Sequence, residues 1–261
     1  MRRLLAPRWL IAHAVVLVVC IGCVVAGFWQ LDRLQQRRTT NAVHEARFQD
    51  EPLPISRLVD LSGGDVQSLE YRRAEATGIF DPSRELLVRS QVFGGQAGFD
   101  VVTPLVLDEG GTVLVNRGWV PLEFDETPVT AAPPPEGRTT VEGVVRPSQE
   151  RGALSRQDQA DDRVVSRIDL DLLEGVVADD LLGVYLEVTG SQDATQLPVP
   201  ASAPDFSDEG PHLNYAIQWF SFAAVGAIGY GFLLRRGVRR GSGGQVRHRL
   251  DAGQPEEIGP R

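Results

Sequence analysis

The chain has 261 residues, of which 26 are basic and 35 are acidic, so its formal net charge is −9. Every basic residue other than histidine is an arginine, because the sequence contains no lysine. This acidic balance excludes a nucleic-acid-binding surface for the chain as a whole. The long apolar runs lie near the two ends of the chain, so the ends and the middle are considered separately.

Two segments are long and apolar enough to cross a bilayer. Residues 9–28 contain His13 as the only ionisable side chain besides two thiols, and residues 213–234 contain no formally charged side chain. About twenty helical residues span roughly 30 Å, the thickness of a hydrocarbon core. We therefore predict transmembrane helices at residues 9–28 and 212–234.

A cleaved secretory signal peptide is an alternative for the first segment, because arginines precede it and small residues follow the apolar run. The apolar run is longer than a usual signal core, and Trp29 and Arg33 follow it directly. These features favour an uncleaved span.

The distribution of charge predicts the topology. The net charge is +3 over residues 1–29, −16 over residues 30–211 and +4 over residues 212–261. Four arginines follow the second span and three acids precede it, so the positive-inside rule places both termini in the cytoplasm. Arg33, Arg37 and Arg38 argue mildly against this orientation, and the flanks of the second span decide it.

This topology describes a two-pass membrane protein. Residues 1–8 would be cytoplasmic, residues 29–211 would form an extracytoplasmic domain, and residues 235–261 would form a disordered, cytoplasmic, arginine-rich tail. The arginines beside the second span would attract anionic membrane lipid.

The middle of the chain has the composition of β-structure. Residues 30–49 keep a helical pattern that Pro52 and Pro54 should end, and a second helical pattern covers residues 169–178. Seven stretches rich in Val, Leu, Thr and aromatic residues predict strands at 70–79, 85–92, 99–107, 112–120, 139–146, 163–168 and 184–189. We predict an α+β domain built on a mixed, largely antiparallel sheet or open barrel of six or seven strands.

The middle offers little chemistry for catalysis. Of the four histidines only His44 and His212 can lie outside the membrane, so a buried nucleophile with a histidine base is not available. We therefore expect no enzymatic activity and no small-molecule substrate. An acid/base pair among Asp158, Asp161, Asp162, Asp169 and Asp171 is the less favoured alternative to a solvated acidic face. Cys20 and Cys23, inside the first span, are interpreted as small packing residues and not as a metal or redox pair.

The second span begins with a histidine above a row of aromatic residues. At about 100° per residue, His212, Tyr215, Trp219 and Phe222 lie within an arc of about 80°. Such a face suits a flat, apolar macrocycle whose iron a neutral imidazole could reach. On spacing alone, an ordinary interfacial aromatic belt is the preferred interpretation.

A polar stripe lies beside the aromatic one. Asn214, Gln218 and Ser221 should meet protein and not lipid, because amides in hydrocarbon need hydrogen-bonding partners. Two sets of small residues should let the two spans approach each other: Ala223, Ala227 and Gly231 in the second, and Gly22 and Ala26 in the first.

Three separated motifs resemble those of the surfeit locus protein one family. They are Gly27 to Arg33 (GFWQLDR), Val115 to Pro121 (VNRGWVP) and His212 to Phe220 (HLNYAIQWF). A fourth block, from Gly78 to Leu105, also resembles the family, and the match runs in order from residue 27 to about residue 222.

The resemblance implies a membrane-anchored assembly factor for haem-copper cytochrome c oxidase, with two spans flanking an outer domain. Family members assist the insertion or retention of haem a in the catalytic subunit, which would be the partner here. The histidine that bacterial members use for haem corresponds to His212, so the resemblance makes haem ligation the preferred interpretation of this residue. Tyr215 and Trp219 would then pack against the haem.

The remaining motif residues have structural interpretations. Trp29 would anchor a helix end, and Gln30 and Arg33 would cap or dock the first helix. Arg117 could bind a haem propionate, but an internal carboxylate is the preferred partner. Gly118, beside Trp119, would permit a bulge or a close approach, and Gln218 belongs to the third motif.

Two other functional classes stay open. The protein could be a structural partner of the oxidase that does not bind haem, or it could be an extracytoplasmic enzyme or sensor domain.

Overall fold

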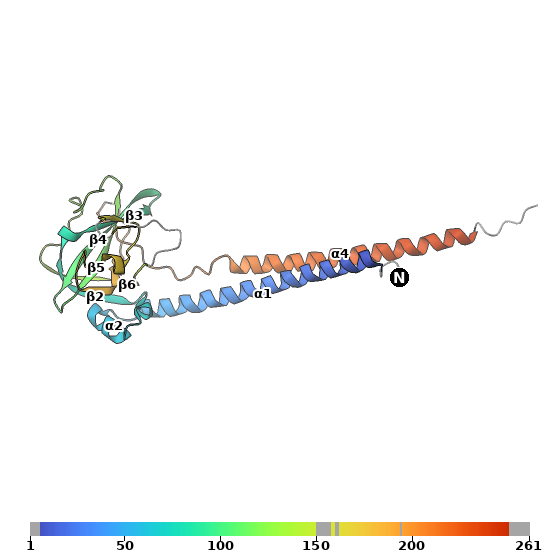
Figure 1. The fold of residues 1–261 in the computed structure, drawn as a ribbon, viewed down its shortest axis with the longest axis horizontal. Coiled ribbons are helices and arrows are strands. Elements are labelled where there is room, and N and C mark those ends of the chain that lie inside the picture. Colours follow the sequence, from blue (N-terminus) through green and yellow to red (C-terminus); the bar gives the residue numbers. More distant parts are fainter. Residues whose placement is uncertain (1–5, 150–157, 160–161, 194, 251–261) are drawn as a thin grey trace, which may run out of the picture. The chain divides into compact units, whose positions relative to one another are not determined.

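The computed structural model describes residues 6–149, 158–159, 162–193 and 195–250 (Figure 1). Arg2, Arg3, Asp161 and residues 251–261, which entered the sequence predictions, lie outside the described residues. The chain divides into two compact units, one formed by residues 1–39 and 208–261 and the other by residues 40–207.

Two long helices dominate the first unit. Helix α1 (Pro7–Gln49) runs on into the second unit, and helix α4 (His212–Leu250) returns beside its first part (Figure 1). Both helices are long and apolar enough to cross a membrane, α4 over His212–Arg236. The predicted pair of apolar helices is therefore present, and α1 continues past residue 29 and ends before Pro52 as the sequence indicated.

Helix α4 is longer than the sequence suggested. Residues 235–250 continue the helix, whereas we expected a disordered tail from Arg235. Extending an existing helix costs far less than starting one, and arginine has a high helix propensity.

The two helices pack along a seam with a seven-residue repeat on α1. His13 pairs with Tyr230, the Cys20 Sγ lies 3.8 Å from the Ala223 carbonyl oxygen, and Gly27 lies against Phe220. A seven-residue repeat keeps one stripe of a helix facing its neighbour. We expected Gly22 and Gly231 among the small residues at this contact. A Cβ at either position would meet nothing within 4 Å, so these two glycines are not needed for the close approach.

The second unit is a mixed sheet that closes on itself. It contains β1 (Leu53–Pro54), β2 (Arg73–Phe80), β3 (Leu86–Phe93), β4 (Gln96–Leu107), β5 (Thr112–Pro121), β6 (Arg138–Pro147), β7 (Val164–Val165) and β8 (Leu181–Glu187). The strand order is β1-β2-β6-β8-β5-β4-β3-β7, and β2 also pairs with β4. This additional pairing closes β2, β6, β8, β5 and β4 into a five-stranded barrel.

Most of the expected secondary structure is present. The pairs β1–β2, β3–β7 and β5–β8 are parallel and the others antiparallel, so the sheet is mixed and largely antiparallel, but the predicted open barrel is closed. The predicted helix at 169–178 shortens to α3 (Leu170–Leu173), because the chain turns at Gly175, where φ is 76°. The predicted strand at 163–168 shortens to β7.

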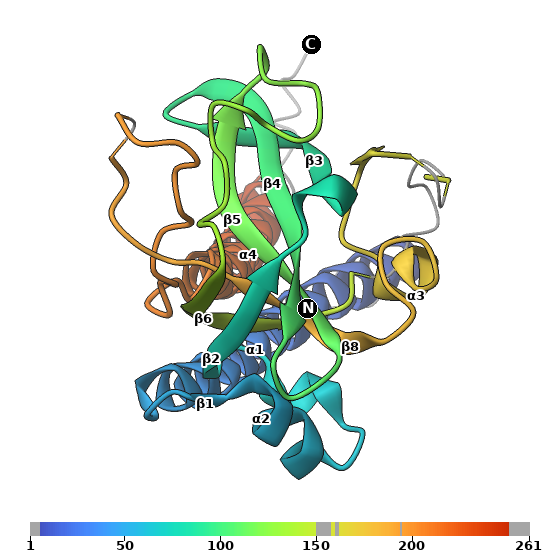
Figure 2. The same ribbon diagram turned by 90° about the vertical axis from the view of Figure 1, so that its left-hand side faces the viewer.

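The barrel interior and one outer face are the main cores. Alternate residues of the barrel strands fill the interior: Ala74, Ala76, Leu105, Leu107, Val113, Val115, Val145, Val184 and Leu186. Helix α2 (Ile55–Ser62) packs Ile55 and Leu58 against this core, beside β1 and β2 (Figure 2). On the outside, Leu170 and Leu173 of α3 cover part of β3, β4, β5 and β8.

Candidate functional site

His212 is the first residue of α4, and it is joined to α1. Its Nδ1 lies 2.9 Å from the Gln30 Oε1, and its side chain is half-buried. The hydrogen bond connects two of the motifs recognised in the sequence, although 182 positions separate the residues.

The start of α4 is held by a second contact with α1. The Arg38 guanidinium donates two hydrogen bonds to Glu209, at 2.7 and 2.8 Å. This bidentate geometry lowers the pKa of Glu209, mainly through the hydrogen bonds from Arg38. Nearer to Gln30, the Arg33 guanidinium lies 5.6 Å from the centre of the Trp29 ring.

The aromatic row lies beside the seam between the helices. Tyr215 and Phe222 are 47% and 52% exposed, and the half-buried Trp219 meets Phe222 edge to face with ring centres 5.9 Å apart. His212 thus lies at the seam while the aromatic rings extend from it along an exposed face. This face can accept a flat apolar ligand or lipid.

The polar stripe of α4 faces away from α1. Asn214, Gln218 and Ser221 are exposed, and the Ser221 hydroxyl donates to the Ile217 carbonyl in its own helix. We expected this face to meet protein, and within the described residues it is open.

Arg117 belongs to a buried network in the second unit. Its Nη2 donates to the Glu85 Oε2 at 2.8 Å and its Nε donates to the Thr103 Oγ1 at 2.8 Å. The Thr103 hydroxyl and the Val129 backbone N–H also donate to Glu85, both at 2.7 Å. The side chain of Glu85 is 0% exposed and that of Arg117 7%. Burial lowers the pKa of Arg117, and the attraction of Glu85 opposes this effect.

Gly118 combines the two roles suggested by the sequence. The register of β4 and β5 shifts so that Arg117 is an extra residue on β5, which is a β-bulge. Gly118 has φ of 126°, and a Cβ there would lie 2.1 Å from the Val199 carbonyl oxygen. Trp119 then pairs with Val199 in both directions, and its ring covers Gly98.

One member of the acidic cluster is structural. Asp158 is buried and not part of a solvated face: its Oδ2 accepts a 2.9 Å hydrogen bond from the Ser166 backbone N–H, and Arg89 and Arg167 lie within ion-pair distance. Burial alone would raise the pKa of Asp158, but the Ser166 hydrogen bonds and the two arginines lower it.

The predicted site residues fall into two groups. Trp29, Gln30, Arg33, His212, Tyr215, Gln218 and Trp219 belong to the first unit, and Arg117, Gly118 and Trp119 belong to the second. Sequence reasoning missed Glu85 as the partner of Arg117. The only signal was a carboxylate directly before the apolar residues Leu86, Leu87 and Val88.

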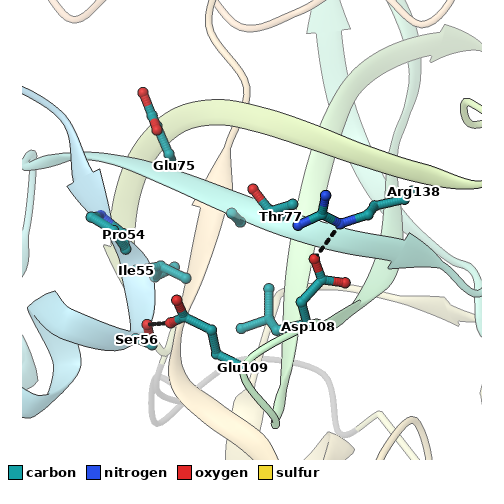
Figure 3. A pocket seen from close by; sticks show the side chains of 10 residues that line it. Pro54, Ile55, Ser56, Glu75, Thr77, Asp108, Glu109 and Arg138 are labelled. Atoms are coloured by element: carbon teal, nitrogen blue, oxygen red, sulfur yellow. Dashed lines mark hydrogen bonds and ion pairs between the residues drawn. The ribbon is translucent and has the colours of Figure 1, made fainter.

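A cavity of about 210 Å³ lies beside α2 and the barrel (Figure 3). Its side chains pair with one another: Arg138 with Asp108, and Ser56 with Glu109. No group of three or more His, Cys, Asp or Glu residues suited to a metal ion occurs among the described residues. Haem iron needs only one or two protein ligands, so this finding does not bear on His212.

The sequence was compared with known proteins. Residues 17–224 match the model of the SURF1 family. The chain is 30% identical to an uncharacterised SURF1-like protein of Mycobacterium tuberculosis, over 97% of this chain and 90% of that protein. It is 29% identical to a SURF1-like protein of Monosiga brevicollis, over 82% and 84% of the two chains. It is 25% identical to human surfeit locus protein 1, over 81% and 73%. With most of its length matched by this model, and with a relative at 30% identity over nearly the whole chain, the protein belongs to the SURF1 family.

Proposed function

We propose that the protein is a membrane-bound assembly factor for haem-copper cytochrome c oxidase. In this proposal it holds haem a for insertion or retention in the catalytic subunit, and the His212 imidazole is an axial contact to the iron. Haem a is the cargo of the protein and not a resident cofactor.

One arrangement supports the haem contact most directly. His212 is the first residue of α4 and is half-buried, with its Nδ1 hydrogen-bonded to Gln30, and the exposed Tyr215 and Phe222 extend along the helix beside it. A neutral imidazole at the edge of an aromatic face is a suitable donor set for a flat macrocycle with central iron. Arg117 takes a structural role in this proposal, because two of its nitrogens donate to Glu85 and Thr103.

The proposed location is a bacterial plasma membrane. The two apolar helices would span it, residues 1–8 and 235–261 would be cytoplasmic, and residues 29–211 would be outside. The warrant is the group of arginines that follows the second span and the acids that precede it.

A second function is favoured by the polar stripe of α4. The exposed Asn214 and Gln218 carry amides that hydrocarbon does not satisfy, so this face suits a helix of the oxidase. A structural partner of the catalytic subunit would need this face and would need no haem.

Replacing His212 distinguishes the haem-holding function from the structural-partner function. His212→Ala should reduce the Soret absorbance per protein after co-expression with haem a synthesis and purification in detergent, because the imidazole supplies the coordination bond. His13→Ala is the matched control, since it removes a second histidine that contacts both helices of the α1–α4 seam. A Soret absorbance equal to that of the parent would exclude the His212 contact. Failure of oxidase assembly in that same variant would favour the structural partner.

A further inference from the structure

We infer that Gln30 is a positioning residue for haem, acting through His212. It fixes the imidazole in the tautomer whose Nε2 carries the free lone pair and thereby strengthens that nitrogen as a ligand. This inference rests on the proposed haem contact at His212.

The direction of the hydrogen bond determines the tautomer. The Gln30 Oε1 is a carbonyl oxygen and can only accept, so the proton of the 2.9 Å contact resides on the His212 Nδ1. A neutral imidazole holds one ring proton, and the Nε2 is then unprotonated. Nε2 is therefore the nitrogen available to iron.

The same contact fixes the orientation of the ring. Gln30 lies in the middle of the continuous helix α1, which limits the movement of its amide, and both residues are half-buried. Ligating histidines commonly donate their second ring N–H to a carbonyl or carboxylate, and this contact orients the ring and raises the basicity of the ligating nitrogen.

The Nε2 edge of the ring lies beside a residue without a side chain. A Cβ placed on Gly210 would lie 3.5 Å from the His212 Cδ2 and 3.6 Å from Nε2. Gly210 has φ of 69°, a conformation that glycine adopts without strain. A side chain at this position would therefore be in van der Waals contact with the Nε2 edge, and glycine adds none there, while Gln30 occupies the opposite nitrogen.

Two substitutions at residue 30 separate hydrogen bonding from packing. Gln30→Leu keeps the approximate size and removes the acceptor, and Gln30→Glu keeps an acceptor oxygen and adds negative charge. Gln35→Leu is the matched control, because Gln35 is an exposed glutamine of the same helix.

Each full-length variant is purified in detergent from cells that make haem a, with His212→Ala in parallel. We expect Gln30→Leu to bind haem about 10-fold more weakly, the lower end of the 10- to 100-fold range for such supporting residues. Gln30→Glu should bind haem as tightly as the parent, because it keeps the acceptor oxygen. It should also lower the haem reduction potential below that of the parent, because a more anionic imidazole stabilises ferric iron. Gln35→Leu should match the parent in both measurements.

Three outcomes would overturn the inference. If Gln30→Leu binds haem like the parent while His212→Ala does not, the positioning role fails and the haem contact stands. If Gln30→Glu fails to restore binding, residue 30 acts through helix packing or with its amide reversed. If His212→Ala also binds haem like the parent, the proposed contact itself fails.

Discussion

Among single residues, Arg117 and Glu85 make the most consequential pair in the second unit. Both are buried, and each of the two Glu85 oxygens accepts a hydrogen bond at 2.7 or 2.8 Å. Removing one member of a buried ion pair leaves the other charge buried and unpaired. The resulting loss of stability is larger than the net stabilisation that the intact pair provides.

Arg117→Met is therefore expected to lower the free energy of unfolding by about 3–5 kcal/mol. The measurement is urea denaturation of the full-length chain in detergent, with the loss of β-structure monitored by circular dichroism. Arg73→Met breaks the exposed pair with Glu142 and should cost less than about 1 kcal/mol. Equal losses in the two variants would contradict a buried, energetically important pair.

Asp100 provides a test of pH dependence. Burial raises the pKa of Asp100, and the hydrogen bond from the Asn116 amide only partly opposes this effect. A carboxyl whose pKa is higher in the folded state favours folding when protonated, and the parent loses this contribution as the pH rises through the folded pKa.

Asp100→Asn should consequently raise the urea midpoint at pH 7, because the amide resembles the protonated acid and carries no charge to bury. The advantage should disappear below the unfolded-state pKa of about 3.9, where the parent carboxyl is neutral in both states. Asp125→Asn changes an exposed acid and should stay within about 0.5 kcal/mol of the parent at all pH values. An advantage that persists at pH 3 would argue against an electrostatic origin.

The partner of Arg117 could not be identified from the sequence. The internal pair was the preferred interpretation of Arg117, but the sequence holds 35 acids, and Glu85 lies 32 positions away. The pairing of β5 with β4, and of β4 with β3, which begins directly after Glu85, brings these side chains together. Gly118 was easier to interpret, because a glycine within a strand itself suggests a bulge or a close approach.

Among the elements, the α1–α4 seam depends on the lack of a side chain at Gly27. A Cβ at this position would lie 2.7 Å from the Phe220 ring, whereas a Cβ at Gly22 would meet nothing within 4 Å. The two glycines therefore form a matched pair for testing the contact between the helices.

Gly27→Leu should open the seam and expose Cys23, which is buried one turn earlier on α1. We expect faster alkylation of Cys23 by N-ethylmaleimide in detergent, measured by mass spectrometry, because reaction requires an accessible thiol. Gly22→Leu should leave the rate unchanged. Equal rates in the parent and the Gly27 variant would mean that the seam does not depend on this contact.

The elements were predicted more successfully than their closure. Stretches rich in Val, Leu, Thr and aromatic residues indicated the long strands, since β propensity can be estimated from local composition. Barrel closure depends on β2 meeting β4 at Gly78, where a Cβ would lie 2.0 Å from the Val106 carbonyl oxygen. Nothing near Gly78 in the sequence indicates which strand requires the glycine, so the open barrel could not be distinguished from the closed one.

At the scale of the whole chain, the prediction concerns membrane topology. A reporter that is active only outside the cytoplasm should give signal when fused after Gln149 and none when fused after Arg240. The reason is the arginine cluster that follows the second span, which the positive-inside rule keeps in the cytoplasm. Fusions of a reporter that is active only in the cytoplasm serve as controls and should give the opposite pattern. If the first reporter gave signal only when fused after Arg240, the protein would have the opposite orientation in the membrane.

The closed barrel also has a consequence for aggregation. Both ends of the strand order are strands of only two residues, β1 and β7. The part of β3 beyond β7 is interrupted by a bulge, with Ser90 at φ of 65°. Long flat edges recruit unfolded strands from other chains, and short or bulged edges do not. We propose that this protein works beside incompletely assembled oxidase subunits. Its short and bulged edges would then protect it from aggregating with unfolded segments of those subunits.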